Sequence, residues 1–377
     1  MLAHTPPMGW NSWNTFGENI SEELIKETAD DWIELGLLDA GYQYLVIDDC
    51  WAEKTRDKDG LLVPDHSKFP NGMKAVSDYV HSKGLKFGMY SCVGTMTCAG
   101  YPGSFEHEFV DAETFASWGV DYLKYDYCYK PHHIPGHILY KRMGMALKNC
   151  QRDILFSACN WGADDVYAWI RSTGAHMYRS TGDIEDKWES IRDIALSQMD
   201  KDCYNASHCY NDMDMLVVGM YGKGNVGRGG CNDEEYRTHF SLWCMMNSPL
   251  MIGCDIRKMG QETLNILTNK ELIALNQDPE GRQAYLIDRG NAAYNNVKVL
   301  VKPISDGSFG IGFFNMGDTD GRGSLQFWDI GLPSLTGYGF KMRDLWEHEN
   351  IGVYKENYTC NLKPHHCKVF RAELVKN

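Results

Sequence analysis

The sequence predicts an α/β fold: a (β/α)8 TIM barrel followed by a C-terminal antiparallel β-sandwich domain. Up to about residue 285, short apolar runs alternate with amphipathic helical stretches. Eight such pairs fit the usual size of about 250 residues for this barrel, whereas a doubly wound sheet normally uses about five or six strands. Beyond residue 285 the helical period disappears. We therefore expect one domain over residues 1–285 and a second over residues 286–377.

The predicted strands of the barrel are short apolar runs, because strands buried on both faces of a parallel sheet carry continuous rather than alternating apolar residues. The first lies near residue 10. The others cover residues 42–48, 86–91, 120–126, 154–159, 175–180, 215–220 and 249–253. In such a barrel the side chains at the carboxyl ends of the strands gather at one face, and that face carries the reactive groups.

Between the strands lie the predicted helices, the clearest of which covers residues 21–38. Ser21 can cap its N-terminus, and Glu22 and Glu23 lie where the helix dipole favours anions. Apolar residues that recur every three or four positions give this helix one buried face. The remaining helices are expected at residues 71–83, 108–118, 137–149, 163–172, 187–200, 233–246 and 260–276.

Four β-rich runs make up the predicted C-terminal domain, and Gly, Asp and Asn residues separate them. They cover residues 297–304, 307–316, 323–330 and 367–375. Runs of this kind without a helical period are typical of an antiparallel sheet. The sequence has no repeat or low-complexity linker between the two domains, so we expect them to pack directly against each other.

The composition narrows the class of protein and of partner. Apolar residues make up 43% and charged residues 23% of the 377 residues, which excludes a disordered or fibrous chain. The net charge of −14 disfavours nucleic acid and anionic membranes and suits a neutral small molecule. No apolar run approaches the length of about 18 residues that a membrane helix needs. The N-terminal segment lacks a basic region followed by an apolar one, so we expect no signal peptide and a cytoplasmic location.

Acidic and aromatic side chains follow several predicted strands. Asp48 and Asp49 end the second strand, Asp126 ends the fourth and Asp183 follows the sixth. Tryptophans lie near the same strand ends, at residues 10, 13, 51 and 161. Carboxylates hold sugar hydroxyls in charge-assisted hydrogen bonds, while aromatic faces pack on the apolar side of a sugar ring. The pattern therefore predicts a sugar-binding site at the carboxyl-terminal face of the barrel.

A lysine, Lys124, stands two residues before Asp126, so both side chains lie on one face of the fourth strand. A lysine that points into the barrel mouth needs an anionic partner or a ligand. Its charge beside Asp126 would keep that carboxylate ionised. We therefore interpret the two residues as reactive groups rather than as a simple surface pair.

Eight segments in this order resemble glycoside hydrolase family 27, the family of α-galactosidases and α-N-acetylgalactosaminidases. They read MGWNSWN, VIDDCW, KFGMYS, TCAGYPGS, DYLKYDYC, RSTGDI, NDMDMLVVG and SPLMIGCDIR. They span the predicted barrel from end to end, and the family has a β-domain where this sequence turns β-rich. The resemblance implies a glycosidase that removes terminal α-D-galactosyl residues from galactose-configured oligosaccharides or glycosides, and that uses no metal or other cofactor.

The resemblance also implies roles for two carboxylates. Asp126 resembles the family's nucleophile and Asp183 its acid/base. Family members retain the anomeric configuration by double displacement, which requires two carboxyl groups about 5–5.5 Å apart across the scissile bond. We therefore expect a raised pKa for Asp183, which must donate a proton, and an ionised Asp126 assisted by Lys124.

Further matches imply the residues that hold the sugar. Asp48 and Asp49 resemble the pair that binds the 4- and 6-hydroxyls of galactose. Arg179 resembles a residue that holds the substituent at C2. The other binding residues that the resemblance implies are Trp13, Tyr90, Lys124, Cys159, Asn160, Trp161 and Asp214.

Four positions depart from the usual family pattern. Asn160 replaces a Glu that contacts the 2-hydroxyl of the sugar, and Tyr127 replaces a smaller residue after the nucleophile. Cys92 stands where an Asp is usual, and Met213 interrupts an Asp-Pro-Asp segment. These changes leave the choice open between an α-galactosidase, an α-N-acetylgalactosaminidase and a β-L-arabinopyranosidase. A galactose-binding barrel without catalysis is the alternative from another class.

The cysteines permit two states. The chain has 13, scattered and odd in number, and a cytoplasmic location favours reduced thiols. Cys98 and Cys128 nevertheless match a disulfide pair of the family. The sequence allows an oligomer without indicating one.

Two other patterns suggest functions that their context does not support. Residues 222–227 spell G-x-G-x-x-G, as in a dinucleotide-binding turn, but no strand with an acidic end follows about 20 positions later. The histidines at residues 132, 133, 137, 365 and 366 resemble metal ligands, but they do not lie beside carboxylates at strand ends. We expect neither a nucleotide nor a metal.

Overall fold

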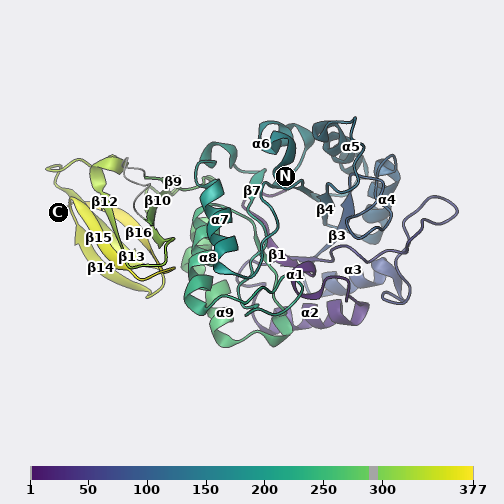
Figure 1. Ribbon diagram of the computed structural model, residues 1–377, viewed down its shortest axis with the longest axis horizontal. Helices are drawn as coiled ribbons and strands as arrows, with labels where there is room; N and C mark the ends of the chain where they lie inside the picture. The colour runs from purple at the N-terminus through teal and green to yellow at the C-terminus, as the bar shows by residue number, and fades with distance from the viewer. Residues whose placement is uncertain (1, 288–295, 377) are drawn as a thin grey trace.

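The computed structural model describes residues 2–287 and 296–376. It has an α/β barrel and, at one end of the long axis, a smaller β-domain (Figure 1). The fold class predicted from the sequence is therefore confirmed. None of the helices in the described ranges has the length and apolar character that crossing a bilayer requires.

The barrel is one parallel sheet of eight strands within the described residues. These are β1 (Met8–Asn11), β2 (Tyr44–Val46), β3 (Lys86–Cys92), β4 (Tyr122–Asp126), β5 (Leu155–Cys159), β6 (Met177–Arg179), β7 (Tyr210–Asp212) and β8 (Leu250–Ile252). Consecutive strands pair with each other from β1 to β7, and β1 also pairs with β8. A parallel bridge between Leu216, just after β7, and Ile252 of β8 closes the barrel.

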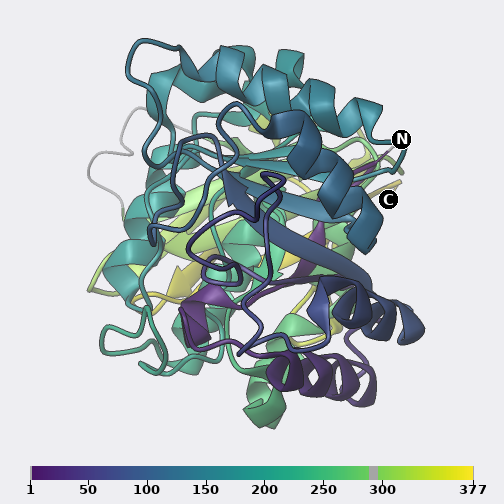
Figure 2. The same cartoon turned by 90° about the vertical axis from the view of Figure 1, so that its right-hand side faces the viewer.

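Helices surround the strands on the outside (Figures 1 and 2). They are α1 (Trp13–Phe16), α2 (Glu22–Glu34), α3 (Gly72–Ser82), α4 (Glu108–Trp118), α5 (Gly136–Asn149), α6 (Val166–Trp169), α7 (Trp188–Gln198), α8 (Asp233–Met245), α9 (Gln261–Leu267) and α10 (Lys270–Asn276). Ser21 caps α2 as predicted, because its side chain accepts a hydrogen bond from Leu24 N. Asn232 and Glu235 form a capping box that begins α8.

Three predicted barrel elements differ from the structure. The run 215–220 is not the seventh strand: the strand is the polar segment Tyr210–Asp212, which an apolar pattern cannot reveal. The helix expected over 163–172 breaks into short pieces, since Asp164 has a left-handed φ of 57°. The helix expected over 260–276 is two helices, because Asn269 caps a new one.

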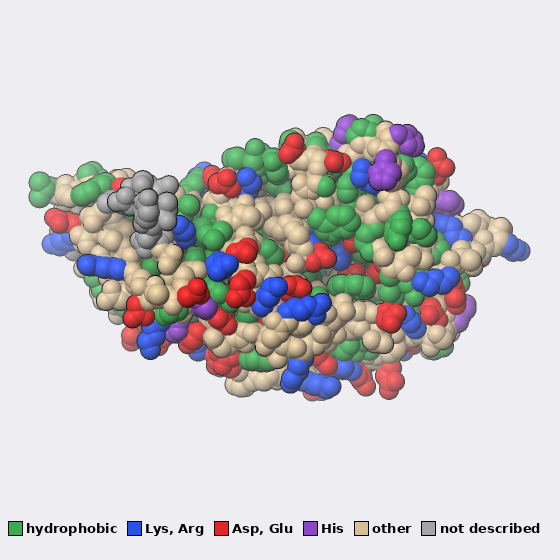
Figure 3. Space-filling model, in the orientation of Figure 1, with side chains coloured by type: hydrophobic (Ala, Val, Ile, Leu, Met, Phe, Trp, Pro, Cys, Tyr) green, Lys and Arg blue, Asp and Glu red, His purple; other side chains and the backbone are tan. Residues whose placement is uncertain are grey.

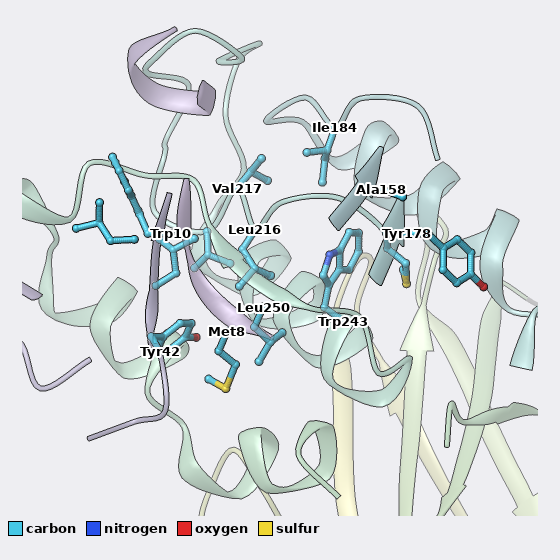
Figure 4. Packing of buried hydrophobic residues seen from close by; sticks show 14 of the residues in the cluster. Met8, Trp10, Tyr42, Ala158, Tyr178, Ile184, Leu216, Val217, Trp243 and Leu250 are labelled. Atoms are coloured by element: carbon cyan, nitrogen blue, oxygen red, sulfur yellow. The ribbon is translucent and has the colours of Figure 1, made fainter. Parts of the chain in front are cut away.

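Apolar side chains close the floor of the barrel and fill the space between strands and helices. Inside the barrel, one cluster includes Tyr44, Tyr122, Leu155, Tyr210 and Met251 from five different strands. A larger cluster packs the outer face of the strands against the helices, and Figure 4 shows part of it around Trp10, Tyr42 and Trp243. Because the interior is packed in this way, the open space lies at the carboxyl ends of the strands.

The C-terminal domain is antiparallel. Its described strands form a six-stranded sheet in the order β14-β13-β16-β11-β10-β9 and a separate pair β12-β15. Their bounds are β9 (Tyr285–Leu286), β10 (Val297–Pro303), β11 (Phe309–Asn315), β12 (Gly321–Gln326), β13 (Tyr338–Asp344), β14 (Glu349–Tyr354), β15 (Asn357–Leu362) and β16 (Cys367–Lys376). Leu325, Phe313, Phe340 and Phe370 belong to the core that the two sheets enclose. None of the four predicted runs covers β9, β13, β14 or β15.

The two domains contact each other through α8 and through segments that follow it. Thr238 Oγ1 donates to the backbone oxygen of His365 at 2.6 Å, and Trp346 Nε1 donates to Ser241 Oγ at 3.0 Å. The ammonium of Lys302, on β10, donates to Asn247 Oδ1 and to the backbone oxygen of Arg282. On the face shown in Figure 3, acidic and basic side chains are interspersed over both domains.

Candidate active site

A cavity with about 600 Å³ of empty space opens at the carboxyl ends of the barrel strands. Its lining contains most of the predicted site residues, from strands and loops far apart in the sequence. They are Trp13, Asp48, Asp49, Tyr90, Cys98, Lys124, Asp126, Cys159, Trp161, Arg179, Asp183 and Asp214. The barrel topology thus brings together carboxylates, cations and indoles that the sequence spreads over 200 residues.

Asp126 ends β4 and is 6% exposed. Both of its oxygens are held: Oδ1 accepts from Tyr127 N at 2.9 Å, and Oδ2 accepts from Tyr90 Oη at 3.1 Å. Burial raises the pKa of this carboxyl to about 6, because the nearby charge of Lys124 and the Tyr127 N–H only partly compensate. The group is therefore oriented in a site of low polarity.

Lys124 pairs with Asp48 rather than directly with Asp126. Its Nζ lies 2.8 Å from Asp48 Oδ2, which also accepts from Asn11 Nδ2 at 2.7 Å. Burial by itself lowers the pKa of Lys124, but Asp48, Cys159 and Asp126 together outweigh burial and raise the pKa well above its usual range. Lys124 is thus a fixed cation between two carboxylates of the cavity wall.

The side chains of the adjacent acids Asp48 and Asp49 bind different partners, and Asp49 N donates to Asp48 Oδ1 at 2.9 Å. Asp49 Oδ2 accepts from Ala99 N at 2.9 Å, and its Oδ1 accepts from Cys50 N at 2.7 Å. Burial raises the pKa of Asp49, and these backbone N–H groups oppose that effect. Two neighbouring carboxylates therefore face the cavity without sharing a partner.

Arg179 binds two further carboxylates of the cavity, Asp183 and Asp214. It is buried at the end of β6 and donates from Nη1 to Asp214 Oδ1 at 2.6 Å and from Nη2 to Asp183 Oδ1. The side chain of Asp183 is 75% exposed toward the open cavity. Asp214 has a left-handed φ of 85°, and its second oxygen accepts from Ile184 N at 2.7 Å. The guanidinium thereby connects an exposed carboxylate to a rigid, buried one.

The expected pKa order of Asp126 and Asp183 is wrong for the free site. Burial acts to raise the pKa of Asp183, but the charge and the hydrogen bond of Arg179 outweigh it and lower that pKa. Asp126 is the carboxyl with the raised pKa, because it is more deeply buried and Lys124 lies closer to Asp48. Sequence spacing predicts which groups share a strand face but not which partner each group chooses.

Both domains match models of a known protein family. Residues 5–278 match the family model described as "Alpha galactosidase A", and residues 294–372 match "Alpha galactosidase C-terminal beta sandwich domain". The chain belongs to the α-galactosidase family, glycoside hydrolase family 27. It is accordingly a glycoside hydrolase of the α-galactosidase type.

Relatives of this glycosidase resemble it along nearly the whole chain. The "Alpha-galactosidase" of Cyamopsis tetragonoloba is 44% identical over 370 residues, which cover 98% of this chain and 86% of the relative. A putative alpha-galactosidase/melibiase from Bacteroides fragilis is 42% identical with a TM-score of 0.92, over 99% of this chain and 80% of that one. Alpha-galactosidase from Saccharomyces cerevisiae, solved with raffinose, is 29% identical with a TM-score of 0.90, over 99% and 98%.

In this glycosidase Asn160 does not line the cavity. It is fully buried, its Nδ2 donates to the Ala163 backbone oxygen at 2.7 Å, and its Oδ1 accepts from Gly162 N at 3.3 Å. An asparagine in this loop can bond to its own turn, which a longer glutamate cannot do in the same way. The neighbouring indole of Trp161 lies on the cavity wall instead.

The glycosidase forms the disulfide that the family resemblance implies, between Cys98 and Cys128, with Cα atoms 5.2 Å apart. Both sulfurs lie within 4.8 Å of an Asp126 carboxylate oxygen and of each other. This is the one cluster of three possible metal-ligand side chains within the described residues, and its sulfurs are already joined. The other eleven cysteines, all in the described ranges, are free.

Two departures from the family pattern have local partners. Met213 N, an N–H that proline would lack, donates to Ser248 Oγ at 3.0 Å. The Cys92 thiol donates to the Cys128 backbone oxygen at 3.1 Å.

In the glycine-rich loop, Gly222 N donates to Asp186 Oδ2 and Val226 N to the Asn14 backbone oxygen, so these groups are not free to bind a phosphate.

Sequence reasoning missed several residues of the cavity wall. They are Asn11, Asn14, Ile184, Met215 and Val226. Asn11 and Asn14 lie in the segment MGWNSWN beside Trp13, a predicted site residue, so their closeness in sequence to Trp13 could have indicated them. Val226 comes from the glycine-rich loop and carries no chemical signal, because only the fold brings that loop to the cavity.

Proposed function

We propose that this glycosidase hydrolyses terminal α-D-galactosides by double displacement with net retention. The observation that carries the proposal is that buried Asp126 and exposed Asp183 line one cavity, with Asp48, Asp49 and Lys124 on the same wall. A buried carboxylate held by two donors suits a nucleophile, and an exposed one at the mouth suits proton exchange with the leaving group and water.

In the first step an Asp126 oxygen forms a bond to the anomeric carbon while the bond from that carbon to the leaving oxygen breaks. Asp183, protonated, transfers its proton to the leaving oxygen. In the second step Asp183 removes a proton from water, the water oxygen bonds to the anomeric carbon and the Asp126 ester bond breaks. The sugar leaves with its original configuration, and both carboxyl groups return to their starting state.

The Arg179 contact explains how Asp183 could gain its proton. In the free site Arg179 lowers the pKa of Asp183. A sugar whose 2-hydroxyl accepts from Arg179 would compete for the same guanidinium N–H groups and weaken that effect. Substrate binding would therefore raise the pKa of Asp183 at the stage when the acid form is needed.

The wall around the ring favours a galactose-type sugar. Asp48, Asp49 and Lys124 offer charged partners to several hydroxyls, and Trp13 offers an apolar face. Since the carboxylate pair is intact, we favour a sugar with a 6-hydroxyl over an arabinopyranose. Galactosides such as raffinose, which is bound in the Saccharomyces cerevisiae relative, are the substrates we propose.

A panel of p-nitrophenyl glycosides tests this function. We expect the α-D-galactoside to be hydrolysed faster than the α-N-acetylgalactosaminide and the β-L-arabinopyranoside, with the α-glucoside, which differs only at C4, as control. Proton NMR should show α-galactose as the first product. First formation of β-galactose would contradict double displacement. Galactose binding without hydrolysis of any glycoside would support the non-catalytic alternative.

A further inference from the structure

The loop after β5 has an unusual backbone for non-glycine residues. Trp161, Asp164 and Asp165 have φ values of 58°, 57° and 49°, in the left-handed region that L side chains rarely adopt. Such a conformation persists only where neighbouring contacts hold it. The loop carries Trp161 on the wall of the cavity, with 38% of that residue exposed. Its position therefore depends on the contacts that restrain it.

One of these contacts comes from the residue after the proposed nucleophile. Tyr127 Oη donates to Asp164 Oδ2, while Tyr127 N donates to Asp126 Oδ1 at 2.9 Å. Tyr127 is buried, its ring stacks on Tyr140 with centroids 5.7 Å apart, and it meets the ring of Trp161 edge-on at 6.4 Å. Tyr127 thus connects the strand end that bears Asp126 to the loop that bears Trp161.

Gly136 and Trp169 lie around the Tyr127–Asp164 hydrogen bond and leave space for it or restrain it. A Cβ atom on Gly136, at the start of α5, would collide with the Tyr127 hydroxyl and come within 3.1 Å of Asp164 Oδ2. Trp169 Nε1 donates to the Asp164 backbone oxygen at 2.6 Å, which restrains the same residue from its other side. Asp164 is therefore held by both its side chain and its backbone.

We propose that the Tyr127–Asp164 hydrogen bond positions Trp161 against the bound sugar and so sets the affinity of this site for its galactoside. This inference rests on the proposed function. Tyr127 and Asp164 are positioning residues, since neither lines the cavity within the described structure. An indole packed on a sugar ring binds ground state and transition state alike, so losing its position raises KM more than it lowers kcat.

Tyr127→Phe removes the hydroxyl and keeps the ring, and it is the main test. We expect KM for p-nitrophenyl α-galactoside to rise about three- to tenfold and kcat to change less than about twofold. Tyr79→Phe is the matched control, because Tyr79 Oη donates to Asp30 at 2.9 Å with Lys83 Nζ over its ring, on the outer helices. Asp164→Asn keeps an acceptor and should stay near the wild-type KM, whereas Asp164→Ala should resemble Tyr127→Phe.

A double-mutant cycle shows whether the effect passes through the indole. If it does, Tyr127→Phe changes KM little once Trp161→Phe is present. A KM that is unchanged in Tyr127→Phe, or that rises equally with and without Trp161, would overturn the inference.

The position of the indole can also be measured without turnover. The fluorescence of Trp161 is the difference between each protein and its Trp161→Phe counterpart. We expect acrylamide to quench this emission more strongly in Tyr127→Phe than in wild type or Tyr79→Phe. Identical quenching would contradict the positioning role. A wild-type protein that hydrolyses no galactoside would refute the proposed function, while quenching would still decide whether Tyr127 positions Trp161.

Discussion

Lys124 in the cavity and Lys302 at the domain junction are both lysines removed from water, but their surroundings differ in charge. The ammonium of Lys124 lies 2.8 Å from the Asp48 carboxylate, which raises its pKa well above the usual range against the effect of burial. Lys302 is 0% exposed and, within the described residues, donates to two uncharged oxygens, those of Asn247 and Arg282. Burial lowers its pKa to about 7.

The difference shows that a buried lysine can serve the chemistry of the site, as Lys124 does, or affect mainly the stability of the fold, as Lys302 does. In the cavity the buried cations Lys124 and Arg179 each have a carboxylate beside them, so the site keeps ionised groups ready to contact a substrate. At the junction the lysine satisfies backbone and amide oxygens, and its charge is a cost that neutral oxygens only partly offset. Substitutions in the cavity should therefore change turnover, and substitution of Lys302 should change stability.

Asp126→Asn should have the largest effect. Without an ionised carboxylate no covalent intermediate forms, so we expect kcat to fall at least about 10⁴-fold. The amide oxygen can still accept from Tyr127 N and the amide NH2 can donate to Tyr90 Oη, so the melting temperature should stay close to that of wild type. Steady-state kinetics and calorimetry measure the two quantities. Normal turnover in this variant would disprove the nucleophile assignment.

Asp183→Asn should follow, with an effect that depends on the leaving group. For raffinose we expect kcat to fall about 10²- to 10⁴-fold, because the departing oxygen needs a proton. The first step with p-nitrophenyl α-galactoside should be nearly unaffected, so the variant should show a burst of nitrophenol followed by a slow steady rate. Equal losses on both substrates would argue against a role as general acid.

Lys302→Met should alter how stability depends on pH. The folded pKa of about 7 lies below the unfolded value of about 10.4, so between these values the unfolded chain binds more protons and stability rises with pH. This lysine should therefore contribute an increase of about 2–3 kcal/mol in unfolding free energy from pH 7 to pH 9, at about 1.36 kcal/mol per unit.

Urea unfolding at pH 7 and pH 9 tests that contribution. The stability of Lys302→Met relative to wild type should be greater at pH 7 than at pH 9, while turnover stays unchanged. Lys341→Met, on an exposed lysine of β13, is the control and should show no such difference. A pH-independent difference for Lys302→Met would mean that Lys302 is not the titrating group.

The smallest of these effects is the shift in pH profile that we expect for Lys124→Met. The reaction needs one proton on the pair Asp126 and Asp183, and in the free site Asp126, which has the higher pKa, carries it, so kcat/KM should fall as the pH rises above about 6. Lys124 lowers the pKa of Asp126, and its removal should move this fall in kcat/KM to higher pH by on the order of one unit. Profiles of kcat/KM against pH measure the shift. Lys86→Met is the control, because Lys86 begins β3 and lies away from the carboxyl ends of the strands. A shift to lower pH would contradict the assignment.

Much of the fold was predictable because apolar runs and helix caps act locally. The positions of β3, β4 and β5 and the cap at Ser21 follow from residues a few positions apart. The prediction failed where long-range contacts decide. The polar strand Tyr210–Asp212 exists because Asn211 bonds to Gln198 and Asn205, which no local pattern contains.

The membership of the site was also open to prediction, since strand ends in a barrel converge on one face. The state of its charges was not. Arg179 lies four residues from Asp183 and 35 residues from Asp214, and its pairing with both reverses the expected pKa order. Asn160 turns back into its own loop, and Tyr127 reaches Asp164 from another strand end.

From residue types and their order alone came the barrel, the β-domain, the family and the list of acids and indoles that could hold a sugar. These depend on periodicity and on short segments, which every copy of the chain carries before it folds. The pairing of each charge, the burial of Asp126 and the orientation of Trp161 came from folding. Burial and hydrogen-bond partners depend on distances between residues far apart in the chain, and those distances exist only once the barrel has closed.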